Sequence, residues 1–383
     1  MRFPHGHLAY CTNIHPAEDW ESTFRAISTH TMKVRDLVAA NARVTAAENF
    51  AVGLRLSAKA AAELVQGDHL LRFKDWLDSQ RAYVFTINGF PYGDFHGTRV
   101  KQNVFRPDWT DRARLDYTKQ LFQIVAELVP EGIDGSVSTL TGSFQEFAAD
   151  EAPIRRHLLE LADFVDDLSE TTGRDLHLGL EPEPRGHFEN TPETLAFFGR
   201  LLTEAADPAR ALRRLGINYD TCHFALQYEE AAASLKTLTD AGLRISKIHL
   251  SAALALNPAE QEAVKAAMTF DEPTYLHQVL ARHLDGRIAR YTDLPDGLAS
   301  LQSDPGAEEW RVHFHIPLDD LPALPLRSTR MNAADALAFA KETPGLCSHW
   351  EIETYTWGVL PAQLQRPVEE QIAGEYRWVL DRV

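Results

Sequence analysis

Short apolar runs alternate with longer segments of helical spacing along most of the chain. In one such segment, Leu121, Ile124, Val125 and Leu128 fall on a single helix face. Eight runs have the length and composition of buried strands: 8–15, 51–57, 82–88, 135–141, 175–181, 215–220, 245–251 and 349–354. Strands that alternate with helices predict parallel β-α units.

The number of strands favours a closed barrel over an open doubly wound sheet. An open sheet commonly carries a glycine-rich phosphate turn at one switch point, and the sequence contains no G-x-G-x-x-G or G-x-x-x-x-G-K-[ST]. We therefore expect an α/β protein with an eight-stranded (β/α)8 TIM barrel and long loops after several strands. The expected organisation is one domain over 1–383 with insertions near 89–110, 252–309 and 318–346, where 258–268 and 273–283 have helical character.

Composition indicates which partners and which cellular compartment to expect. The net charge of −17 argues against a nucleic-acid partner, because phosphate binding depends on clustered Lys and Arg. The three cysteines form no C-x-x-C and indicate a reducing compartment. No run approaches the ~20 apolar residues of a membrane span, and the first ten residues lack the apolar core of a secretion signal. These features predict a soluble cytoplasmic protein with no nucleic-acid partner and no membrane span.

Side chains that could bind a metal or transfer a proton lie at the ends of the apolar runs. Asp220 and His223 follow the run at 215, Glu181 ends L-H-L-G-L-E, and His249 and Glu353 end two further runs. In a parallel barrel such side chains converge at one end. Three carboxylates would repel one another there unless a divalent cation joined them, and the O,O,O,N set suits Mn, Mg, Zn, Fe or Co. Alternatively, these are structural residues bonded to loop backbone.

The order of these motifs resembles the xylose isomerase-like barrel superfamily. Its elements are a strand-end Glu, then D-T-C-H, I-H-L-S and I-E-T. That superfamily includes sugar isomerases, ketose 3-epimerases, inosose dehydratases and abasic-site nucleases. Four further phrases resemble the EboE family, whose members are described as metabolite traffic proteins: Y-C-T-N-I-H-P, N-G-F-P-Y-G-D-F-H-G, L-E-P-E-P and E-N-T-P-E-T.

The resemblance implies a divalent metal site and an acid/base pair. It makes four residues the metal ligands: Glu181, Asp220, His249 and Glu353. In epimerases of this kind the two glutamates, here Glu181 and Glu353, also exchange a proton with a bound hydroxyketone. His223 matches a histidine that contacts substrate or stabilises the enediolate. Glu351 shares a strand face with Glu353, but the I-E-T motif selects Glu353 as the ligand.

Several other residues are candidates for substrate binding. Arg185 matches an E-P-x-x-R pattern and could hold a substrate oxygen. Glu183 and Glu189 either hydrogen-bond a ligand or anchor their loop. His15 follows the first apolar run closely enough to reach the site.

The pair His313 and His315 introduces an alternative. It resembles the nuclease pattern, in which a polar pair at this point of the chain helps to hold a cluster of three zinc ions, although there the first member is usually Asp. That pattern also uses histidines after the second and third strands, where this chain has Ser57 and Asn88, with His96 further along the loop. The three histidines, His96, His313 and His315, are therefore candidates for a second metal, for substrate contact or for the site wall.

Three functions remain open at this stage. One is a metal-dependent isomerase or epimerase acting on a sugar or cyclitol-type metabolite in a biosynthetic or metabolite-trafficking pathway. The second is a metal-dependent hydrolase of a phosphoester or a small-molecule C–O bond. The third is a non-catalytic metabolite-binding barrel. A homo-oligomer or pathway partner proteins are compatible with all three, and no redox cofactor is indicated.

Overall fold

The computed structural model describes residues 1–40, 49–93, 95–96 and 100–383. Part of the predicted insertion near 89–110, and with it part of the N-G-F-P-Y-G-D-F-H-G phrase, falls on residues 94 and 97–99 and so lies outside the described residues. None of the described helices combines the length and the hydrophobicity that a membrane span requires.

Eight parallel strands form the central sheet, in the predicted order along the chain. They are β2 (Gly6–Tyr10), β3 (Phe50–Arg55), β4 (Ala82–Asn88), β5 (Gly135–Leu140), β6 (Leu176–Glu181), β7 (Leu215–Asp220), β8 (Arg244–Leu250) and β14 (His349–Ile352). The pairing runs β2-β14-β8-β7-β6-β5-β4-β3, and a parallel bridge between Cys11 and Gly53 joins its two edges. The short β1 (Arg2–Phe3) pairs antiparallel with β2. The predicted barrel is confirmed.

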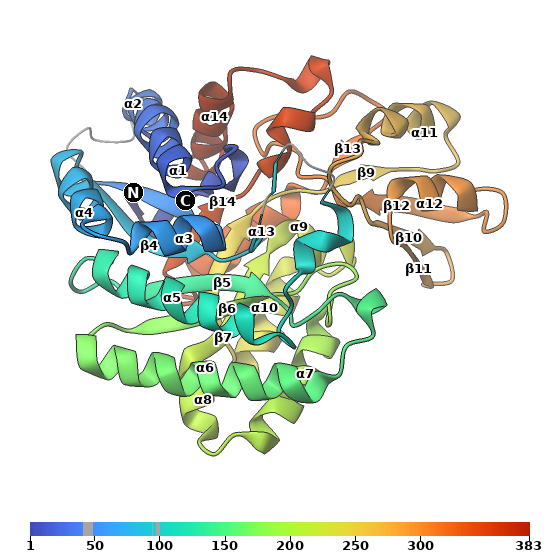
Figure 1. Cartoon of the computed structure of the whole chain (residues 1–383). Helices are drawn as coiled ribbons and strands as arrows, with labels where there is room; N and C mark the ends of the chain where they lie inside the picture. Colours follow the sequence, from blue (N-terminus) through green and yellow to red (C-terminus); the bar gives the residue numbers. More distant parts are fainter. Residues whose placement is uncertain (41–48, 94, 97–99) are drawn as a thin grey trace.

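Helices cover the outside of this sheet (Figure 1). The covering helices are α1 (Trp20–Ala26), α2 (Met32–Ala39), α3 (Ala58–Leu64), α4 (His69–Ser79), α5 (Arg112–Leu128), α6 (Glu151–Thr172), α7 (Thr191–Glu204), α8 (Pro208–Arg214), α9 (Thr221–Leu226), α10 (Ala231–Asp240), α13 (Met331–Glu342) and α14 (Val368–Leu380). In α5, the predicted face of Leu121, Ile124, Val125 and Leu128 is buried against the sheet. Burial of such apolar stripes, more than helix propensity, stabilises these helices.

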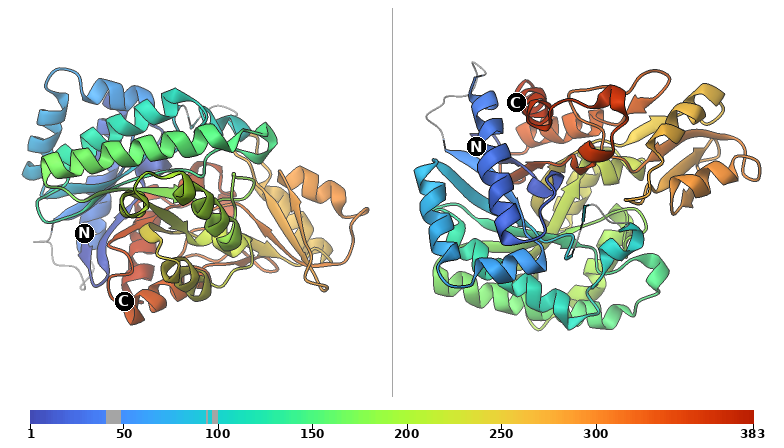
Figure 2. Two further views of the ribbon diagram at one scale, coloured as in Figure 1. Left: turned by 90° about the horizontal axis from the view of Figure 1, so that it is seen from below. Right: turned by 45° about the horizontal axis from the view of Figure 1, so that its top comes forward.

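A second, antiparallel sheet is inserted between β8 and α13. Its strands are β9 (Leu254–Leu256), β10 (Val279–His283), β11 (Ile288–Tyr291), β12 (Ala307–Val312) and β13 (Arg327–Ser328), accompanied by α11 (Gln261–Ala267) and α12 (Leu294–Ser300). It has its own apolar core, which includes Leu256, Phe270 and Trp310. Figures 1 and 2 show it projecting from one side of the barrel.

The expected helix near 273–283 is wrong, because residues 279–283 form strand β10 of this second sheet, between β11 and β12. β10 forms a local hairpin with β11, which begins at Ile288, and its other partner β12 lies further along the chain. The expected helix near 258–268 corresponds to α11. The segment 318–346 contains α13. The buried Ala333, Ala336 and Leu337 of this helix belong to the main core.

Strand register aligns the polar residues inside the barrel. Asp220 of β7 is level with His249 of β8, and His249 is level with Glu351 of β14. Side chains alternate along a strand, so Lys247 and His249 share the inner face of β8, as do Glu351 and Glu353 at β14. The barrel therefore presents a polar layer near the carboxyl ends of its strands.

Candidate metal centre

Four buried side chains meet at the carboxyl end of the barrel. Glu181 ends β6, Asp220 ends β7, His249 lies near the end of β8, and Glu353 follows β14 by one residue. One ligand atom of each lies within 4.8 Å of the others. The structure thus brings together the four residues that the sequence singled out, from positions spread over more than 170 residues of chain.

His249 stands at the centre of this group. Its Nδ1 lies 3.0 Å from Oε1 of Glu181, 3.1 Å from Oε2 of Glu353 and 3.7 Å from Oδ2 of Asp220. Its Nε2 lies 2.9 Å from Oε2 of Glu351. One imidazole nitrogen therefore faces the three carboxylates, and the other faces into the barrel.

The two carboxylate oxygens of Asp220 have different surroundings. Oδ1 caps α9 by accepting the backbone N–H groups of Cys222 and His223, and it also accepts the hydroxyl of Ser251. Oδ2 is buried and has no hydrogen-bond partner among the described residues. Burial raises the pKa of Asp220, but the nearby imidazoles, His223 first, outweigh it and hold the pKa well below its usual value. Burying an anionic oxygen without a partner destabilises the folded protein unless a cation binds to it.

Two amide side chains orient Glu353. Asn13, in the loop after β2, donates from Nδ2 to Oε1 at 2.8 Å, and Asn88, at the end of β4, donates to the same oxygen at 3.3 Å. Oε2 is left facing His249. At the end of β4, where the nuclease pattern has a histidine, this chain therefore supplies an amide donor.

The donor set fits a divalent cation. Three carboxylates so close together repel one another, and one of them would have to take up a proton unless a cation were present. Oxygen donors with one imidazole suit Mn, Mg, Zn, Fe or Co. The orphaned Oδ2 of Asp220 supplies a further reason to expect a metal ion among these four side chains.

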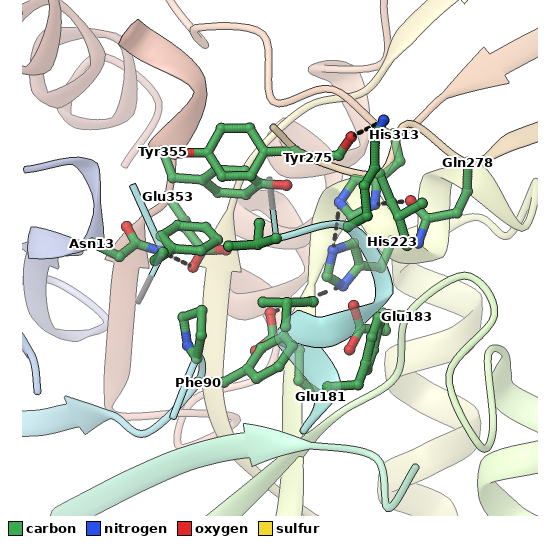
Figure 3. Close-up of a pocket in the computed structure, with 17 residues that line it drawn as sticks. Asn13, Phe90, Glu181, Glu183, His223, Tyr275, Gln278, His313, Glu353 and Tyr355 are labelled. Carbon is green, nitrogen blue, oxygen red and sulfur yellow. Dashed lines mark hydrogen bonds and ion pairs between the residues drawn. The ribbon is translucent and has the colours of Figure 1, made fainter. Parts of the chain in front are cut away.

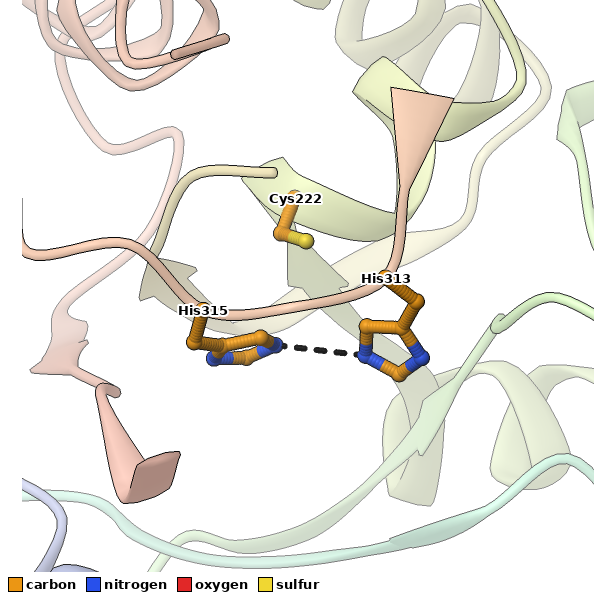
Figure 4. Close-up of side chains that lie close together, drawn as sticks. All are labelled: Cys222, His313 and His315. Carbon is orange, nitrogen blue, oxygen red and sulfur yellow. Dashed lines mark hydrogen bonds between the residues drawn. The ribbon is translucent and has the colours of Figure 1, made fainter. Parts of the chain in front are cut away.

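A second group consists of three imidazoles that meet at Nε2 of His313, with His223 and His313 labelled in Figure 3 and His313 and His315 in Figure 4. Nε2 of His313 lies 3.1 Å from Nε2 of His223 and 3.3 Å from Nε2 of His315. The Nδ1 atoms of His223 and His315 face the backbone carbonyls of Pro182 and Glu353. Carbonyl oxygens only accept, so both Nδ1 atoms carry hydrogen and both Nε2 atoms present lone pairs in the neutral rings.

The tautomer of His313 is fixed by Gln278, which directly precedes β10. The amide nitrogen of Gln278 donates to Pro184 O at 3.1 Å, which places its Oε1 2.7 Å from Nδ1 of His313. His313 Nδ1 is therefore also a donor, and the Nε2 lone pair of His313 faces those of His223 and of His315. Cys222 lies beside His313 and His315 (Figure 4), and burial raises the pKa of its thiol well above the usual value.

A cavity opens above both groups (Figure 3). Its floor includes Glu181, Glu183, His223, His313 and Glu353. Its walls are mainly apolar and come from the loop after β4, from the segment before β10 and from the turn after β14: Phe90, Phe95, Val104, Phe105, Tyr275, Leu276 and Tyr355. Lys101 also lines it, but its Nζ donates to Tyr275 O and to Asp293, both at 2.6 Å. The cavity combines an acidic floor with an aromatic enclosure.

Of two substrate-binding candidates, Glu183 lines the cavity and Arg185 does not. Glu183 lines the cavity with Oε1 lacking a partner in the described part of the chain, and burial together with the charge of Glu181 raises its pKa well above its usual value. Arg185 has a left-handed backbone with φ of 65° and pairs with Glu146 at 3.4 Å. It is absent from the cavity lining.

The remaining candidates act as supports. Glu189 accepts hydrogen bonds from Gln145, Gln227 and Arg290, so it anchors its loop. His15 is buried at 2.9 Å from the hydroxyl of Tyr10 and stacks on His30. His96 donates from Nε2 to Asn13 O at 2.6 Å, and its Nδ1 lies 2.9 Å from the hydroxyl of Tyr275. The structure therefore brings neither His15 nor His96 into the metal-ligand groups.

Comparison with known proteins gives the fold. No family model matches the chain, and no curated protein matches it. Among solved structures, the probable 3-DHS dehydratase AsbF from Bacillus anthracis has 10% sequence identity and a TM-score of 0.52, with 98% of this chain and 100% of that chain covered. The IOLI protein with a bound zinc atom has 12% identity and a TM-score of 0.48, with 98% of each chain covered. A D-tagatose 3-epimerase-like protein has 13% identity, the same TM-score and the same coverage.

Identities this low are informative about fold alone. The likeness to AsbF agrees with the closed parallel sheet and its covering helices. The chain therefore has a (β/α)8 barrel fold.

Proposed function

We propose that this chain is a metal-dependent isomerase or epimerase that acts on a polyhydroxylated small molecule, a sugar or cyclitol-type metabolite. The observation that carries the proposal is the convergence of Glu181, Asp220, His249 and Glu353 within 4.8 Å, with the two glutamates lining a partly open cavity.

In this proposal the four residues hold one divalent cation. A cation bound there supplies Lewis acidity that polarises a carbonyl and acidifies the C–H beside it. Glu181 and Glu353 then act as the acid/base pair, one carboxylate removing the proton and the other returning it. They reach the cavity from strands β6 and β14, which are separated by β7 and β8 in the sheet, so they address a bound molecule from different sides.

Other residues of the cavity would hold and enclose the substrate. The Nε2 atom of His223 presents a lone pair that can accept a hydrogen bond from a substrate hydroxyl. Glu183, whose Oε1 lacks a partner among the described residues, offers a second polar contact. The aromatic walls exclude water from the reacting atoms.

The test is exchange of a carbon-bound hydrogen. Unphosphorylated ketoses and inososes are incubated in D₂O with the metal-reconstituted protein, and deuterium uptake is followed by NMR. We expect uptake that falls ~100- to 10,000-fold in Glu181→Gln and in Glu353→Gln, since each removes an acid/base group. Glu146→Gln, outside the cavity, is the matched control. Full exchange in both site variants would reject the acid/base assignment, and tight binding without exchange would indicate a metabolite-binding barrel.

A second candidate is a metal-dependent hydrolase of a phosphoester or a small-molecule C–O bond. It is favoured by the imidazoles of His223 and His315, whose Nε2 atoms both face Nε2 of His313. We propose these three rings as a second cation site beside the first. Paired cations stabilise both the attacking and the leaving oxygen of a displacement. Hydrolysis of aryl phosphate esters that requires two equivalents of metal and is lost in His313→Asn would favour this candidate over the first.

The finer assignments are proposals as well. We propose a cytoplasmic, single-domain protein that serves an EboE-type metabolite-trafficking pathway, as a homo-oligomer or with pathway partner proteins. Support comes from the Y-C-T-N-I-H-P phrase, because its Asn13 donates the amide hydrogen bond that orients Glu353. A motif that supplies a site residue is expected to serve function rather than packing alone.

A further inference from the structure

A buried ion pair lies inside the barrel, one layer below the proposed metal ligands. Nζ of Lys247 is 2.7 Å from Oε2 of Glu351, and both side chains are fully buried. Lys247 belongs to β8, two residues before His249, and Glu351 belongs to the neighbouring β14, two residues before Glu353. Alternation along each strand therefore places the pair beneath two of the proposed ligands.

Glu351 also contacts His249 directly. Oε2 of Glu351, which accepts the hydrogen bond from Lys247, lies 2.9 Å from Nε2 of His249. An ionised carboxylate only accepts hydrogen bonds, so Nε2 carries the hydrogen. The lone pair of the neutral ring is then on Nδ1, which faces Glu181, Asp220 and Glu353.

The fold makes room for this arrangement. A Cβ atom at Gly53 of β3 would lie 2.0 Å from Oε1 of Glu351 and 2.4 Å from Tyr10 O. Only glycine at this position lets the Glu351 carboxylate occupy the barrel interior. The counter-charge of Lys247 is equally necessary, because a lone buried carboxylate so close to three others would be strongly disfavoured.

We infer that Lys247 and Glu351 are positioning residues of the metal centre: the pair holds His249 as its Nε2–H tautomer and aims Nδ1 at the cation. The inference rests on the ligand set of the proposed function, and neither residue is itself a ligand. Carboxylates hydrogen-bonded to ligating histidines fix ring orientation and strengthen the ligand, and their loss typically weakens metal affinity ~10- to 100-fold.

Metal affinity tests the inference without any substrate. Zn²⁺ binding to full-length protein is measured by competition with a chromogenic chelator, and the environment of bound Co²⁺ is followed by its visible absorption. The variants are Glu351→Gln and the double replacement Lys247→Met/Glu351→Met. The double variant removes both charges together, and replacing a buried pair by apolar residues of similar volume often leaves stability unchanged.

We expect both variants to bind Zn²⁺ at the carboxylate site ~10- to 100-fold more weakly than wild type and to shift the Co²⁺ absorption, while the metal-free double variant unfolds at the wild-type urea concentration. Asp166→Asn is the matched control, since Asp166 forms a partly buried ion pair with Arg214 on the outer layer. Wild-type affinity and absorption in both variants would overturn the inference and leave the pair as packing. Absence of binding in the wild type would instead reject the ligand set itself.

Discussion

Nε2 of His223 lies 3.1 Å from Nε2 of His313, and the Nδ1 atom of each ring faces an oxygen acceptor. Two neutral imidazoles in these tautomers cannot hydrogen-bond to each other through Nε2, and His315 adds a third lone pair at 3.3 Å. Histidine nitrogens coordinate zinc through such lone pairs, with the other ring nitrogen held by a hydrogen bond to an oxygen.

Under the second candidate function, this relationship predicts a zinc site that is separable from the carboxylate site. His313→Asn is expected to lower the zinc content by one equivalent per chain after reconstitution, while metal at Glu181, Asp220, His249 and Glu353 is retained. Elemental analysis of dialysed protein measures this. His69→Asn, at an exposed position, serves as the control. Unchanged zinc content in His313→Asn would show that the three imidazoles are wall residues.

The amide of Asn13 is predicted to matter for the metal centre. Asn13→Ala removes the 2.8 Å hydrogen bond to Glu353 and leaves only the longer one from Asn88. Loss of such a supporting contact is expected to lower metal affinity or turnover ~10- to 100-fold. Asn13→Asp should be worse, because it places a carboxylate against Glu353. Chelator competition compares both with Asn103→Ala, an exposed asparagine; equal affinities would contradict the prediction.

Two glycines are predicted to respond in opposite ways to replacement by alanine. At Gly53 the new Cβ would meet Glu351 and the backbone of Tyr10, so Gly53→Ala should lower the free energy of unfolding by about 3 kcal/mol. At Gly199, exposed within α7, no atom lies within 4 Å of the new Cβ. Gly199→Ala should raise the free energy of unfolding by about 0.5–1 kcal/mol. Urea unfolding of the metal-free proteins measures both, and a neutral Gly53→Ala would contradict the close packing of Glu351.

Stability is predicted to fall as the pH drops below neutrality. Burial lowers the pKa of His15 and of His177 to about 3, whereas a histidine in the unfolded chain titrates near ~6.5. Between these values the unfolded chain binds more protons, so the free energy of unfolding decreases towards acid, by about 1 kcal/mol per pH unit for each group.

Urea unfolding of metal-free protein at pH 7, 6 and 5 checks this slope. His15→Phe should reduce it, because the variant removes one such group while keeping a ring against His30. His69→Gln should leave it unchanged. A slope that is the same in His15→Phe and wild type would contradict the role given to burial.

The barrel and its four-residue cluster could be predicted from the sequence, because both follow from patterns of neighbouring residues. Alternating apolar runs and helical faces predict parallel strands, and parallel strands place their carboxyl ends together. Glu181, Asp220, His249 and Glu353 each stand at such an end, so their convergence needs no knowledge of the loops.

The remaining parts of the site depend on long-range contacts that no local pattern contains. Gln278 and Tyr275 come from the inserted segment that carries the second sheet. In that sheet β9 pairs with β12 and β13, which are distant in sequence. Arg185 was expected near a substrate, but its left-handed backbone and its pairing with Glu146 put it outside the cavity lining. Asn13 did carry a signal, since it follows the first strand within the C-T-N-I-H-P phrase.

Metal content is the most direct measurement, made by mass spectrometry on wild type and Asp220→Asn after reconstitution with Mn or Zn. Asparagine can still cap α9 through its side-chain oxygen, so the variant should fold. Asp207→Asn replaces another helix cap, at α8, and is the matched control. We predict that Asp220→Asn holds one metal per chain fewer than wild type and Asp207→Asn. Equal metal content in all three, or no metal in the wild type, would contradict a metal centre at this site.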